Sequence, residues 1–98
     1  MSPHNPAQYA RSAADALDRL VRDVRAGRAE WGHPHNVRQA ADDLTRAADA
    51  MATALQQMAA ALDPHDPSTQ RSATALHLAG QAATTAATNL RNARRSLH

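Results

Sequence analysis

The sequence predicts an all-α protein, an antiparallel up-down-up three-helix bundle of long Ala-rich helices in a single domain spanning residues 1–98. Two observations carry this prediction. Apolar residues recur at steps of three and four along three long segments, and short clusters of Pro, Gly, Asn and Asp separate those segments. Strand signals are missing, since Ile is absent, Val is scarce and nothing alternates with a period of two. Short loops favour antiparallel neighbours, so the segments should fold back on one another.

The first helix is expected over about residues 6–31. Asn5 is a good N-cap residue, and Pro6 suits the first helical position. Gly32 opens the first break in the chain and is the expected helix stop. The apolar positions of this segment are Ala10, Ala13, Leu17, Leu20, Val21, Val24 and Trp31.

The second helix is expected over about residues 37–62. Asn36 is the predicted N-cap, and Gln39 three residues later completes a weak capping box. Eight consecutive positions of this segment are apolar at steps of four and three, which is the spacing of a coiled-coil seam: Val37, Ala41, Leu44, Ala48, Met51, Leu55, Met58 and Leu62.

The third helix is expected over about residues 67–97, where Asp66 and Pro67 repeat the pattern of cap residue before proline. Its predicted seam comprises Leu76, Ala79, Ala83, Ala86, Leu90, Ala93 and Leu97. A helix with small residues on two sides can pack against two neighbours, although plain Ala enrichment explains the pattern equally well. The candidate helix-packing interface therefore comprises Trp31, Ala75, Ala79, Ala82, Ala86 and Ala93.

The composition predicts a thin core. Ala accounts for 25 of the 98 residues, whereas Leu accounts for nine and Phe and Ile are absent. Burial of a Leu side chain contributes about 1.5–3 kcal/mol, and burial of an Ala contributes far less. We therefore expect a second copy or a helical partner protein to add buried surface, and dimerisation into a larger helical bundle is one such assembly. Trp31 is expected to close the end of the bundle, or else to anchor a partner.

Formal charge is unevenly distributed. Residues 36–67 carry two Arg and five Asp, whereas residues 68–98 carry four Arg and no acid. Up-down-up topology would gather the basic residues at one pole. The functional interpretation is a site for nucleic acid or an acidic protein; the alternative is that these arginines complement helix dipoles. The candidate anion or partner contacts are Arg22, Arg25, Arg28, Arg38, Arg91, Arg94 and Arg95, with His33, His35 and His98 at the same pole.

No catalytic or metal-binding pattern emerges. The histidines His33, His35 and His98, or His4 and His65 with Asp63 or Asp66, lack the fixed spacing of metal ligands on a rigid element. Cys is absent, and the serines have no His and acid in a triad-like pattern. We expect no metal, no cofactor, no small-molecule substrate and no enzymatic activity.

Neither a membrane span nor a cleaved signal peptide is expected. No apolar run approaches the roughly 18 residues that span a bilayer, and the first residues lack a basic-then-apolar pattern. A cytoplasmic location is the expectation, with uncleaved export left open. The predicted function is that of a non-enzymatic helical interaction or scaffold protein that self-associates or binds a helical partner through Ala-rich faces. The alternative is a small nucleic-acid-associated or regulatory protein that binds polyanions through its basic pole.

Overall fold

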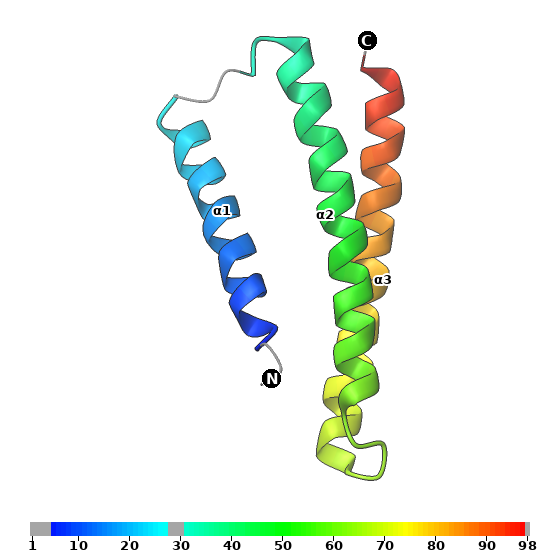
Figure 1. Cartoon of the computed structure of the whole chain (residues 1–98). Coiled ribbons are helices and arrows are strands. Elements are labelled where there is room, and N and C mark those ends of the chain that lie inside the picture. Colours follow the sequence, from blue (N-terminus) through cyan, green and yellow to red (C-terminus); the bar gives the residue numbers. More distant parts are fainter. Residues whose placement is uncertain (1–4, 28–30, 98) are drawn as a thin grey trace. The chain divides into compact units, whose positions relative to one another are not determined.

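The computed structural model describes residues 5–27 and 31–97, and these residues confirm the all-α fold class. They form helices α1 (Ala7–Arg25), α2 (Pro34–Ala61) and α3 (Pro67–Ser96), and the described ranges contain no strand (Figure 1). The chain divides into two compact units, Met1–His33 and Pro34–His98. The second unit is a helical hairpin in which α2 and α3 pack extensively on each other. The packing of α1 as the third member of a bundle stays a prediction.

Helix α1 begins as the sequence predicts and ends earlier. Pro6 takes the N-cap position that the sequence predicts for Asn5, and the side chain of Asn5 accepts a hydrogen bond from the backbone N–H of Ala7, the first helical residue, at 3.0 Å. At the other end, Gly27 has a φ of +71°, in the left-handed region, and its N–H donates to the carbonyl of Val24. Because Gly adopts this conformation without steric cost, Gly27 ends the helix, and the prediction that Gly32 is the stop is wrong.

Helix α2 begins at Pro34, ahead of the predicted start at residue 37. Pro suits the first position of a helix because it has no N–H to leave unpaired there and its φ is already helical. Asn36 consequently lies inside the first turn of α2, and its prediction as the N-cap is wrong.

Residues 62–66 connect α2 to α3, and the start of α3 confirms the predicted cap. The Asp66 carboxylate accepts hydrogen bonds from the backbone N–H of Ser68 at 2.9 Å and from its hydroxyl at 2.8 Å. Pro67 takes the first helical position. Across the connection, the amide of Gln70 donates to the carbonyl of Pro64 at 2.7 Å. Hydrogen bonds to Asp66 and Pro64 therefore tie this turn to the first residues of α3.

The seam between α2 and α3 is lined by very small residues. Ala87 is fully buried, and a Cβ built on Gly80 would lie 3.5 Å from the backbone oxygen of Ala52. Such a short separation shows that the two helices approach closely at this point, where Gly80 leaves room for a methyl group. The buried residues of the hairpin are Ala41, Ala52 and Ala59 on α2 and Gly80, Ala83 and Ala87 on α3.

Part of the predicted seam is displaced by one residue in the structure. On α2, Met51 and Met58 lie outside the contact with α3, and each is about half exposed (50% and 52%). On α3, three predicted seam residues are exposed in the same way: Ala79, Ala86 and Ala93. The physical reason is the close approach at Gly80, which brings the smallest residues of each helix to the seam and turns the methionines aside.

Candidate functional site

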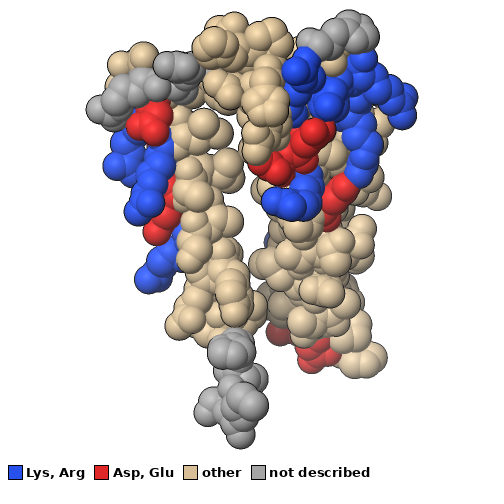
Figure 2. Space-filling view, turned by 45° about the horizontal axis from the view of Figure 1, so that its top comes forward, with Lys and Arg blue, Asp and Glu red and all other residues tan. Residues whose placement is uncertain are grey.

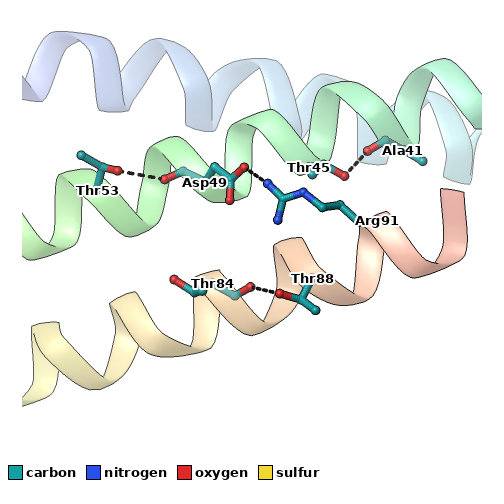
Figure 3. Close-up of polar contacts among 7 residues, drawn as sticks. All are labelled: Ala41, Thr45, Asp49, Thr53, Thr84, Thr88 and Arg91. Atoms are coloured by element: carbon teal, nitrogen blue, oxygen red, sulfur yellow. Dashed lines mark hydrogen bonds and ion pairs between the residues drawn. The ribbon is translucent and has the colours of Figure 1, made fainter. Parts of the chain in front are cut away.

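Two long edges of the hairpin, one on each side of the seam, differ in chemistry. On the first edge, Arg91 forms an ion pair with Asp49, and the Nε of Arg94 lies 3.0 Å from a carboxylate oxygen of Asp42 (Figure 3 shows the first pair). These pairs join the first turns and the middle of α2 to the last two turns of α3, as an antiparallel hairpin requires. We call this side the ion-pair edge.

Threonines extend the ion-pair edge along both helices. The hydroxyl of Thr53 donates to the carbonyl of Asp49 at 3.3 Å, and that of Thr88 donates to the carbonyl of Thr84 at 3.2 Å (Figure 3). Thr53 follows Asp49 by four residues and Thr88 precedes Arg91 by three, so each shares a helix face with a member of the ion pair. Because these hydroxyls are satisfied by their own helix, they need no ligand.

The opposite edge follows from helical geometry. Successive residues of an α-helix are about 100° apart, so Met51 lies about 200° from Asp49, across the buried seam. Ala93 is related to Arg91 in the same way. Met51 on α2 and Ala93 on α3 therefore lie on the same side of the hairpin, away from the ion pairs.

This second side is apolar, and we call it the apolar edge. Its α2 part consists of Met51 and Met58, seven residues apart and half exposed, and Leu78 of α3 borders it at 60% exposure. Its α3 part carries five exposed alanines at steps of four, three, four and seven, interrupted at Asn89: Ala75, Ala79, Ala82, Ala86 and Ala93. The structure thus places the predicted alanine stripe beside two large flexible apolar side chains.

The structure distributes the predicted basic residues over both units. Arg38, Arg91, Arg94 and Arg95 lie at the open end of the hairpin, where α2 begins and α3 ends. Figure 2 shows basic and acidic groups interleaved on this end, and the ion pairs place Asp49 and Asp42 opposite two of its arginines. Arg22 and Arg25 belong to the last turn of α1, in the other unit. Arg28, His98 and His4 lie outside the described residues.

The remaining candidates are dispersed. Trp31 lies in the turn before α2 and is 39% exposed. His33 and His35 flank Pro34 at the start of α2, whereas His65 lies in the connection to α3, where its N–H donates to Asp63. Within residues 5–27 and 31–97, no three His, Asp or Glu side chains are placed to hold a metal ion.

The methionines of the apolar edge were missed as site residues by sequence reasoning, which assigned them to the core. The signal that could have separated the two edges is the register of charges. Asp42 and Asp49 are seven residues apart on α2, and an antiparallel pairing with Asp66 at the turn brings Arg91 and Arg94 of α3 near them. That register makes one edge of the hairpin ionic. The residues two positions after Asp49 and Arg91, which are Met51 and Ala93, then lie on the other edge.

α1 also presents an unburied apolar stripe. Leu17, Val21 and Val24 are each 40–45% exposed, and no side chain of α1 is buried. Helices in proteins gain most of their stability by packing an amphipathic face, so this stripe is a second surface suited to binding.

None of the described helices combines the length and the apolar character that crossing a membrane requires. Comparison of the chain with protein-family models, with curated proteins and with solved structures finds no match.

Proposed function

We propose that this chain is a non-enzymatic helical interaction or scaffold protein that self-associates or binds a helical partner through the apolar edge of its hairpin. The observation that supports this most directly is the half exposure of Met51 and Met58 beside an α3 face that carries five exposed alanines. Met is flexible and polarizable, and it recurs at surfaces that bind other helices. A contiguous apolar face of this kind marks an interaction surface.

The thin seam supplies the second argument. The buried residues of the hairpin are Ala and Gly, and none of its large side chains is fully buried among the described residues. Ala contributes little burial energy, so the hairpin gains from additional covered apolar surface. A helix laid along the apolar edge would cover the methionines and use the alanines as a close-packing surface.

The test is the molar mass of the whole chain in solution, by size-exclusion chromatography with light scattering over micromolar concentrations. We expect a dimer or larger assembly. Ala86→Glu should raise the dissociation constant of this assembly at least tenfold, because a carboxylate would be buried in the interface. Ala86 is exposed in the hairpin, so the variant should keep its helical circular dichroism.

The matched control is Thr88→Glu, which adds the same charge on the ion-pair edge and should leave the assembly unchanged. A chain that stays monomeric throughout and co-purifies with no partner would count against the proposal. Equal effects of the two glutamates would count against the apolar edge as the binding surface.

Binding of a polyanion at the open end of the hairpin is the second candidate function. Arg38, Arg91, Arg94 and Arg95 supply positive charge there, and helix-end arginines can contact phosphate. The ion pairs with Asp42 and Asp49 offset part of this charge within the protein. We therefore rank this function below helical association.

A further inference from the structure

We propose that the occupant of the apolar edge is a second copy of this chain, arranged so that α2 of each copy packs against α3 of the other around a two-fold axis parallel to the helices. This inference rests on the proposed self-association and adds its partner and its geometry. A two-fold axis makes such an interface self-complementary, because each copy contributes both halves of it.

Side-chain size supports this pairing. The α2 part of the apolar edge carries large residues, Met51 and Met58, whereas the α3 part carries alanines interrupted only at Asn89. Packing α2 against α3 of the second copy sets large side chains against small ones, as knobs fit into holes. The other two-fold arrangement, with its axis across the helices, would set methionine against methionine and leave alanine against alanine.

The positions along the helices also match. Ala52 lies beside Gly80 within the hairpin, so Met51 and Ala82 lie at nearly the same height along it, as do Met58 and Ala75. At 1.5 Å per residue the mismatch in each pair is only about 1.5 Å. A two-fold axis parallel to the helices preserves height, so each methionine meets an alanine of the second copy.

Charge complementarity selects the same arrangement. Helix α2 carries two Arg and three Asp, and α3 carries four Arg and no acid. The proposed pairing places the basic α3 beside α2, whose net charge is −1, in both contacts across the interface. The alternative arrangement places α3 beside α3, with four Arg on each side, which is unfavourable.

The extent of the apolar edge predicts a moderate affinity. The alanine stripe runs from Ala75 to Ala93, about 27 Å at 1.5 Å per residue, and two helices side by side are about 20 Å wide. Each copy would cover roughly 500 Å², which is near the lower end for specific interfaces. Dissociation in the micromolar range is the expectation.

Disulfide trapping tests the pairing, because the chain has no cysteine of its own. Met51→Cys and Ala82→Cys would be prepared separately, mixed in equal amounts, allowed to exchange and oxidised. We expect a disulfide-linked dimer in the mixture, approaching about half of the chains when exchange is complete, and at least tenfold less in either variant alone. Denaturing electrophoresis without reductant measures it.

The control mixture is Thr53→Cys with Thr88→Cys, whose positions lie on the ion-pair edge and should not become linked. Linked dimer from Met51→Cys alone would show α2 facing α2 and overturn the pairing while leaving self-association intact. A dimer by light scattering with no linkage in the Met51→Cys and Ala82→Cys mixture also overturns it. A monomer by light scattering overturns both this pairing and self-association, as it would if the chain's own α1 covered the edge.

Discussion

Gly80 lies in the middle of α3 with room beside it for one methyl group. A Cβ there would lie 3.5 Å from the backbone oxygen of Ala52 and 3.7 Å from the Cβ of Leu55, which are ordinary van der Waals distances. Glycine in a helix interior costs about 0.5–1 kcal/mol relative to alanine. We therefore expect Gly80→Ala to stabilise the protein by about that amount, as measured by urea unfolding.

Gly80→Leu provides the contrast at the same position. Its added atoms would extend beyond the free space into the backbone of Ala52, and overpacking of this kind costs about 1–3 kcal/mol. Destabilisation by both substitutions would mean that α2 and α3 are closer than the structure places them.

Residues whose role is local were predictable from the sequence, and those whose role depends on a neighbour were not. Asn5 and Asp66 form their cap hydrogen bonds within two residues, so the identity of the next few residues determines them. Gly32 is the helix stop that the sequence predicts, whereas the structure has the positive φ at Gly27. No sequence pattern reports a dihedral angle.

At the scale of the element, the start of α3 has a built-in dependence on pH. The pKa of the Asp66 carboxyl lies below its ordinary value of 3.8, because the hydroxyl of Ser68 and then the backbone N–H groups of Ser68 and Thr69 hydrogen-bond to the charged form. A carboxyl group whose pKa is lower in the folded state than in the unfolded state stabilises the fold at pH values above its unfolded-state pKa. That stability is lost as the pH falls through the folded-state pKa.

The comparison of the protein with Asp66→Asn isolates this effect, since Asn also caps helices but does not titrate. We expect the unmodified protein to have a higher Tm than Asp66→Asn at pH 6, and this difference in Tm to shrink from about pH 4 downwards. Thermal unfolding followed by circular dichroism between pH 2 and pH 6 would measure it. A difference that is unchanged at pH 2 would refute a role for the charged cap.

The helices were predictable as elements, but the face that each turns to its neighbour was only partly so. Periodicity identified an apolar stripe wide enough for more than one contact, and it included both Met51 and Leu55. Which side of the stripe faces α3 depends on how closely the helices approach. That distance is fixed by Ala52 and Gly80 together, residues from different helices whose contact no single segment reveals.

At the scale of the whole molecule, part of the charge is paired within the hairpin. The sequence predicts an acidic second segment and a basic third segment, and in the structure two ion pairs join them, Asp49 with Arg91 and Asp42 with Arg94. Their side chains are 38–56% exposed, so each pair contributes at most about 1 kcal/mol after screening by solvent. The sequence could predict the attraction between these helices. It could not predict how much charge would stay available to a partner.

This distribution leads us to expect weak binding of nucleic acid. The whole chain should bind a short DNA duplex no more tightly than about 10⁻⁴ M at physiological salt, as measured by fluorescence anisotropy. The polyanion function would be favoured instead by tighter binding that weakens with salt. That binding should also be abolished in the triple variant Arg91→Ala, Arg94→Ala and Arg95→Ala. Arg11→Ala with Arg19→Ala and Arg71→Ala removes the same charge elsewhere and serves as the control.

The alanine seam of the hairpin also bears on its response to temperature. The heat capacity of unfolding rises with the apolar surface that becomes hydrated, and methyl groups offer little of it. A hairpin whose buried residues are Ala and Gly should therefore fall below the roughly 12–15 cal/mol/K per residue that is usual for globular proteins. A small heat capacity change flattens the curve of stability against temperature. Cooling would then weaken this fold less than it weakens a protein with a core of large apolar side chains.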